Sequence, residues 1–138
     1  VFLRQETYDV EFPLDDNNKN LIADMIQTMY DNNGIGLAAN QVGYNRKIFI
    51  IDVSNEKNSP QIFINPVTEK QAKEKLTEGE GCLSCPGKFI NVRRSTYVGL
   101  SWFCEHGKKQ YKTFYNFPAR VVQHEMDHLN GKLIIDLS

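Results

Sequence analysis

Apolar residues recur at helical spacing between residues 18 and 32, where they form one stripe of Leu21, Ile22, Met25, Ile26 and Met29. Asp15 and Asp16 precede this stripe and provide capping and negative charge, which favour a helix N-terminus. Gly34 follows it, and glycine commonly ends helices. The pattern predicts a helix over residues 18–32 whose stripe packs in the core.

Shorter apolar runs predict strands. Residues 47–53 form a nearly continuous apolar run, which is typical of a buried strand, and residues 61–69 follow as a second strand. Pro66 cannot donate to a sheet, so it predicts an edge or a bulge there. Residues 91–104 and 109–115 predict a hairpin that turns at 105–108. Residues 132–136 predict a short final strand.

A second helix is expected from Pro118 to Asn130, since proline suits a first helical turn and Gly131 suits a helix end. A helix, a run of strands and a late helix together predict an α+β fold. We expect antiparallel strands packed around this C-terminal helix, with one N-terminal helix. The length of 138 residues fits a single domain over 1–138.

Composition narrows the function. The net charge of −1 disfavours nucleic-acid binding through bulk electrostatics, so no direct nucleic-acid partner is expected. No apolar run reaches the roughly 20 residues that a membrane helix needs, so no membrane partner is expected either. Three cysteines are an odd number, which fits a reducing compartment and thiols that bind metal, act in catalysis or are buried.

The strongest chemical signal is His124-Glu125-Met126-Asp127-His128 on the late helix. Residues four apart share one helix face, so both imidazoles can reach one metal ion. Glu125 lies beside the first histidine, where it suits a general base that acts on water. A catalytic centre typically has three protein ligands, so a third must come from elsewhere in the chain. The candidates are Cys82, Cys85, Cys104, Glu80 and Asp127.

The segment around Cys82 and Cys85 leaves alternatives open. Its glycines and proline predict an irregular loop over residues 78–87. The Cys-x-x-Cys spacing also permits a structural zinc site with His124 and His128, or a redox dithiol. The histidine motif alone permits a zinc endopeptidase, although Asp136 is the only carboxylate downstream of His128 to serve as its third ligand.

Three segments together resemble the signature motifs of peptide deformylases. They are residues 34–41 (GIGLAANQ), 80–84 (EGCLS) and 123–128 (QHEMDH), in the order that the family has them. The resemblance covers nearly the whole chain. It implies an enzyme that removes the formyl group from N-formylmethionine at the N-terminus of newly made proteins, using one divalent metal ion. Ferrous iron is the expected metal in the cell, and zinc or nickel are accepted substitutes.

The resemblance also implies the site residues. The metal ligands are Cys82, His124 and His128, so Cys85 is not a ligand. Glu125 is the general base, and the Leu83 N–H and the Gln41 side-chain amide donate hydrogen bonds to the formyl oxygen. The substrate-binding positions are Gly34, Ile35, Gly36, Glu80, Gly81 and Val121.

The role expected of the two glycines is to let a peptide lie against the backbone at Ile35. The residues expected to line the methionine pocket are Ile35, Leu83, Val121 and His124. Glu80 is expected to form an ion pair with Arg94.

Formylated nascent peptides are the expected partners, in the cytoplasm. Many bacterial members continue past Ser138 into a helix that touches the ribosome. We therefore expect a short form, as in some phage members. The ribosome stays a candidate partner although that docking helix is absent from the sequence.

Overall fold

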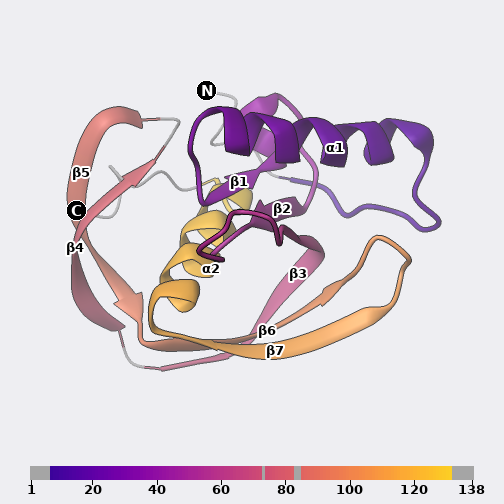
Figure 1. Ribbon diagram of the computed structural model, residues 1–138. Coiled ribbons are helices and arrows are strands. Elements are labelled where there is room, and N and C mark those ends of the chain that lie inside the picture. The colour runs from indigo at the N-terminus through magenta and orange to yellow at the C-terminus, as the bar shows by residue number, and fades with distance from the viewer. Residues whose placement is uncertain (1–6, 73, 83–84, 132–138) are drawn as a thin grey trace.

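The computed structural model describes residues 7–72, 74–82 and 85–131, and side chains are described outside residues 73–93. In this part of the chain the elements follow the order α1 (Asp16–Asp31), β1 (Gly36–Ala38), the short 3-10 helix η2 (Ala39–Val42), β2 (Ile48–Ile51), β3 (Gln61–Gln71), β4 (Glu74–Cys82), β5 (Cys85–Ser95), β6 (Tyr97–Phe103), β7 (Lys109–Tyr115) and α2 (Asn116–Leu129). The α+β class and both predicted helices are confirmed (Figure 1). None of the described helices is long and apolar enough to cross a membrane.

Five strands form one antiparallel sheet in the order β1-β2-β3-β6-β7. This order puts β1 at one end of the sheet, with β2 as its neighbour on one side. The pairing of β3 with β6 shifts register between Ile64 and Val67. Pro66 lies within that shift, so the bulge predicted from this proline is confirmed.

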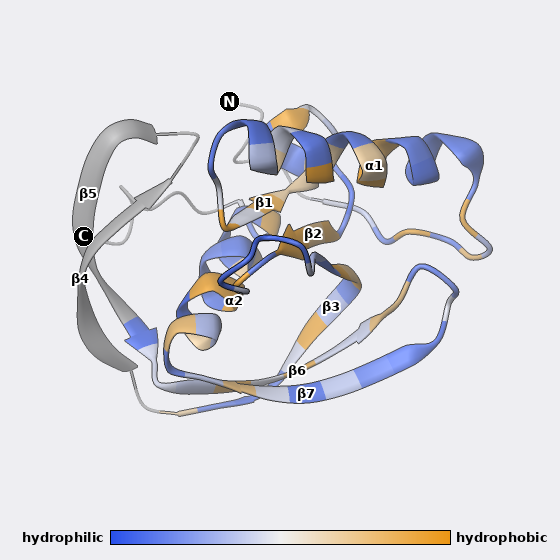
Figure 2. Ribbon diagram, in the orientation of Figure 1, coloured by the Kyte–Doolittle hydropathy of each residue, from blue (hydrophilic) through white to orange (hydrophobic). Residues whose placement is uncertain are grey.

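The continuous apolar run of β2 is explained by helices on both faces of the sheet (Figure 1). Ile48 and Ile50 belong to the core cluster that contains the stripe of α1. Phe49 and Ile51 belong to the second cluster, which contains the apolar residues of α2. Successive side chains of a strand point to opposite faces, so a strand covered on both sides has no polar position. Figure 2 shows β2 in orange between the two helices, while much of β7 is blue.

The β4–β5 hairpin forms a separate two-stranded sheet that lies alongside α2 (Figure 1). The irregular loop predicted over residues 78–87 is therefore wrong for the residues described here, since the chain is extended up to Cys82 and again from Cys85. The glycines that suggested a loop lie within paired strands, and register shifts follow Thr77 and Gly81.

The predicted strand over residues 91–104 is in fact two strands. The chain bends at Thr96, where the β4–β5 hairpin ends and β6 of the large sheet begins. The hairpin turn at residues 105–108 is confirmed, because β6 and β7 pair across it. The predicted strand over residues 132–136 lies outside the described residues.

Candidate active site

Helix α2 buries both apolar residues and ionisable residues. Ala119, Val122 and Leu129 pack into the second core cluster, which fixes the rotation of the helix against the sheet. His124, Glu125 and His128 are also buried, with 8%, 3% and 1% of their surface exposed. Burial of ionisable groups costs free energy unless they are paired or bind a metal, so this polar cluster is a candidate site.

The two histidines converge through their Nε2 atoms, which lie 3.3 Å apart. The imidazole rings meet at 61° with their centroids separated by 5.0 Å. Two nitrogens that each lie about 2.1 Å from one ion in tetrahedral geometry are about 3.4 Å apart, so the observed spacing fits a shared metal. The helix therefore holds the two histidine nitrogens at a spacing that suits two ligands of one metal ion.

Asn40 fixes the end of this helix, although no pattern in the sequence assigned it a role. Its side chain is fully buried, and its Nδ2 donates to the carbonyl oxygen of His128 at 2.5 Å. Thr7 donates to the next carbonyl, that of Leu129, at 2.7 Å. Carbonyls in the last turn of a helix lack partners within the helix, so these bonds anchor the turn that carries His128. The position of Asn40 inside the first motif, residues 34–41, was the one feature of the sequence that could have indicated its role.

Gln41 follows Asn40 on η2, and its amide has a defined orientation. The Oε1 atom accepts a hydrogen bond from the Ala38 N–H at 2.9 Å. Because an amide has one acceptor end and one donor end, the NH₂ group is the end that can donate to a substrate oxygen. This orientation is the one that the predicted role of Gln41 requires.

Residues 34–36 link α1 to the end of the sheet. The Gly34 N–H donates to the carbonyl of Met29 at 2.8 Å, so this glycine satisfies the last turn of α1. The Ile35 carbonyl accepts from the Asp52 N–H at 2.7 Å, and Gly36 pairs with Ile51 in the sheet. The segment to which the family resemblance assigns substrate binding is thus held by main-chain bonds on one side.

A buried carboxylate, Asp52, supports this segment. It accepts hydrogen bonds from Tyr30 Oη at 2.5 Å, from the Ser54 N–H at 2.9 Å and from the Ser59 N–H at 3.1 Å. Burial by itself would raise the pKa of Asp52, but the hydrogen bonds from Ser54, Tyr30 and Ser59 outweigh it and lower the pKa to about 2. Burial and the bond to Asp52 raise the pKa of Tyr30 to about 12.

Ile35 and Val121 lie in the same apolar environment. Val121 is buried in the second core cluster, and Ile35 and Met126 pack against that cluster. Two of the residues expected to line a methionine pocket are therefore brought to one cluster. Leu83, the third apolar candidate, lies outside the described residues.

The base of the β4–β5 hairpin is bonded to α2. Gln123 accepts from the Ser95 N–H and donates to the Ser95 carbonyl, both at 2.8 Å, while the buried Arg94 forms an ion pair with the partly exposed Asp127. Cys82 is the last residue of β4 and pairs in register with Cys85. The side chains of Glu80, Cys82 and Cys85 are outside the described set, so the Glu80–Arg94 pair and the thiolate ligand stay predictions.

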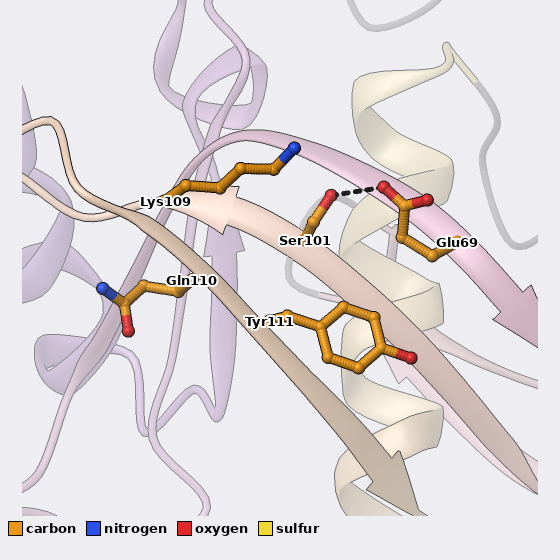
Figure 3. Close-up of a pocket in the computed structure, with 5 residues that line it drawn as sticks. All are labelled: Glu69, Ser101, Lys109, Gln110 and Tyr111. Atoms are coloured by element: carbon orange, nitrogen blue, oxygen red, sulfur yellow. Dashed lines mark hydrogen bonds between the residues drawn. The ribbon is translucent and has the colours of Figure 1, made fainter.

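A hollow of about 470 Å³ lies on the other side of the sheet from α2 (Figure 3). It is lined by Glu69, Ser101, Lys109, Gln110 and Tyr111, and Ser101 donates to Glu69 at 2.7 Å. None of these residues belongs to the motifs found in the sequence. The hollow is therefore a different surface from the histidine site.

Comparison with known proteins agrees with this geometry. The family model of polypeptide deformylases matches residues 2–138. A peptide deformylase of Pseudothermotoga lettingae is 44% identical over 98% of this chain and 76% of its own length, and one of Synechocystis is 42% identical over 89% and 67%. The crystal structure of a peptide deformylase from Legionella pneumophila superposes with a TM-score of 0.93 at 38% identity, covering 99% of this chain and 79% of that one. The chain therefore belongs to the polypeptide deformylase family.

Proposed function

We propose that the buried cluster on α2, together with β1, η2 and the segment from Cys82 to Cys85, forms the active site of this chain. Members of the family, this chain included, are metal-dependent hydrolases that remove the formyl group from N-formylmethionine at the N-terminus of newly made proteins. The observation that carries the proposed site is the pair of buried Nε2 atoms 3.3 Å apart on a helix that also buries Glu125.

Cys82, His124 and His128 are the proposed metal ligands. One thiolate and two imidazoles suit ferrous iron, zinc or nickel, and ferrous iron is our proposal for the cell. When bound, the ion supplies Lewis acidity that polarises the formyl group and makes water nucleophilic at neutral pH.

The residues of the chain supply the proton transfers and the hydrogen bonds. Glu125 accepts the proton of the attacking water and returns a proton to the nitrogen of the departing amine, so that formate and a free α-amino group form. The Gln41 NH₂ group and the Leu83 N–H donate to the formyl oxygen as negative charge develops on it. One such donor is typically worth about 3–4 kcal/mol in the transition state.

Substrate binding is assigned to the end of the sheet. A peptide that adds beside β1 would lie against Gly34, Ile35 and Gly36, with its methionine side chain toward Val121. Glu80 and Gly81 would face the same peptide from the β4–β5 hairpin. The apolar environment of Ile35 and Val121 supports this assignment, since a flexible thioether packs well in an irregular apolar pocket.

Formylated nascent peptides are made by ribosomes, so we propose that the enzyme acts in the cytoplasm on chains that leave the ribosome. Direct contact with the ribosome is a further prediction. Binding of the protein to the ribosome could be measured by co-sedimentation with 70S particles at low and high salt.

The proposed function is tested by hydrolysis of formyl-Met-Ala-Ser. Protein loaded anaerobically with Fe²⁺ or Ni²⁺ is expected to release formate and free Met-Ala-Ser in equal amounts, and chelation is expected to abolish the reaction. Absence of formate release from metal-loaded, folded protein would contradict the proposal. Cleavage of internal peptide bonds would favour the zinc endopeptidase.

The ligand assignment is tested by a matched pair of variants, Cys82→Ser and Cys85→Ser. We expect Cys82→Ser to lose metal and turnover, whereas Cys85→Ser keeps both. Loss of metal together with unfolding in Cys85→Ser would support the structural zinc site of four ligands instead.

A further inference from the structure

Gly36 lies against the side chain of Glu125. A Cβ atom placed on Gly36 would be 2.7 Å from Glu125 Oε2 and 3.1 Å from both Cδ and Cγ of the same side chain. Carbon and oxygen atoms that are not bonded normally stay beyond about 3.0–3.5 Å, so even a methyl group has no room at this position.

Backbone conformation does not explain this glycine. The glycines with positive φ among the described residues are Gly43, Gly107 and Gly131. Gly36 is instead the first residue of β1 and pairs with Ile51. Glycine weakens a strand because it loses more backbone entropy than other residues and has no side chain to pack. A strand position that nevertheless holds glycine is therefore explained by the close approach of another group, which here is Glu125.

Neither backbone can easily yield to a larger residue. On one side, Ile35 is bonded to Asp52, and Leu37 and Ala38 are buried. On the other side, α2 is anchored at its last turn by Asn40 on the His128 carbonyl. The movable part of the contact is the Glu125 side chain, so a methyl group at position 36 would displace the carboxylate.

We propose that Gly36 is a positioning residue for catalysis: its missing side chain is the space in which the Glu125 carboxylate is held. This inference rests on the proposed function for its catalytic consequence. It adds a second role to the peptide approach proposed above for Gly36. The carboxylate is confined from the β1 side, which limits the directions from which it can reach a water molecule or an amine.

The two roles of Gly36 predict different kinetics. If Gly36 confines Glu125, Gly36→Ala should lower kcat by about 100-fold or more with KM nearly unchanged, because a shift of about 1 Å in a catalytic group has that effect. If Gly36 serves peptide approach alone, Gly36→Ala should raise KM and leave kcat nearly unchanged.

The decisive experiment is a double-mutant cycle between Gly36→Ala and Glu125→Ala, read by thermal unfolding of the metal-loaded protein. With Glu125 present, Gly36→Ala is expected to lower Tm by roughly 5 °C or more. In the Glu125→Ala background the same substitution should leave Tm unchanged or raise it, since alanine restricts the unfolded chain more than glycine does. Equal losses of Tm in both backgrounds would overturn the proposal.

Gly99→Ala is the matched control. Its Cβ would lie 2.5 Å from Tyr111 Oη and 2.7 Å from Lys70 Cγ, which is a comparable overlap with exposed side chains on the outer face of the sheet. These side chains can swing into solvent, so Gly99→Ala should keep kcat and KM. Metal content should stay the same in all variants.

The Tm cycle tests the contact independently of the reaction. If the wild-type protein failed to deformylate, the proposed function would be wrong, while coupling in the cycle would still support the confinement of Glu125 by Gly36.

Discussion

The helices α1 and α2 are nearly equal in length, 16 and 14 residues, and cover opposite faces of the strands around β2. Their buried faces differ in kind. Helix α1 buries only apolar side chains, namely Leu21, Ile22, Met25 and Met29. Helix α2 buries a comparable apolar set and, beside it, His124, Glu125 and His128.

This difference separates stability from chemistry. Burial of apolar surface stabilises the fold at about 25 cal/mol per Å², and α1 follows that rule alone. The three buried ionisable residues of α2 destabilise the fold instead, because burial removes the hydration of their polar groups. Helix α2 tolerates them since its apolar residues and the bonds from Asn40 and Thr7 hold it in place. Mutation of the buried polar residues of α2 should therefore lower the catalytic rate, whereas mutation of the buried residues of α1 should lower the stability of the fold.

The largest effect is expected on α2 from Glu125→Gln. Removal of a general base typically costs 10²–10⁴-fold in rate, or about 3–5 kcal/mol in the barrier. Glutamine has nearly the same shape, so the variant should fit beside Gly36, keep its metal and unfold at an unchanged or higher temperature. Measurements of kcat, metal content and Tm decide it, and turnover near that of the wild type would contradict the assigned role.

On α1 the corresponding change is Met25→Ala. Met25 is fully buried among apolar residues, so truncation should lower the free energy of unfolding by about 3 kcal/mol through lost contacts and a cavity. The folded fraction should keep its kcat at low temperature. Denaturant unfolding checks the prediction, with the exposed Asp24→Ala on the same helix as control. A loss of kcat without a loss of stability would break the distinction between the helices.

A smaller effect is expected where α1 reaches the β1 segment through Tyr30 and Asp52. The pKa of Tyr30 is raised to about 12, so its contribution is complete below pH 10 and lost as pH rises toward 12. The pKa of Asp52 is lowered to about 2, so its contribution is present above about pH 4 and lost as pH falls toward 2. Tyr30→Phe should therefore lower stability by about 1–2 kcal/mol at neutral pH and flatten the alkaline decline. An unchanged alkaline slope in denaturant titrations would argue against this account.

The smallest effect is expected at the start of α1. Asp15 caps the helix by accepting from the Asn18 N–H at 2.8 Å, and Asp15→Ala should cost about 1 kcal/mol. Deformylation by the folded protein should be unaffected. Asp15→Asn, which can still accept the bond, is the control and should retain most of the stability.

Local patterns predicted the elements whose burial has a simple geometry. The stripe of α1, its cap at Asp15 and the two-sided burial of β2 follow from periodicity and composition. The β4–β5 hairpin was missed because Gly79 and Gly81 weaken a strand signal, while its pairing is set by a partner strand and by bonds to α2. Periodicity carries no information about such long-range partners.

For the candidate site too, local patterns predicted the features that depend on neighbouring residues and missed those that depend on long-range contacts. The spacing of His124 and His128 predicted their convergence, since helix geometry alone determines it. Asn40 and Gln123 were missed as supports because their hydrogen bonds join residues 88 and 28 positions apart. The contact of Gly36 with Glu125 likewise depends on how α2 packs against β1, which no local pattern encodes.

The place of β1 at the end of the sheet has a consequence for the range of proteins that this chain can serve. An end strand offers amide and carbonyl groups, and these are identical in every polypeptide whatever its side chains. If a substrate peptide adds beside β1 as proposed, its recognition through main-chain groups would discriminate little among sequences beyond the first residue. Such broad specificity suits deformylation, because this reaction acts on nascent chains of many different sequences.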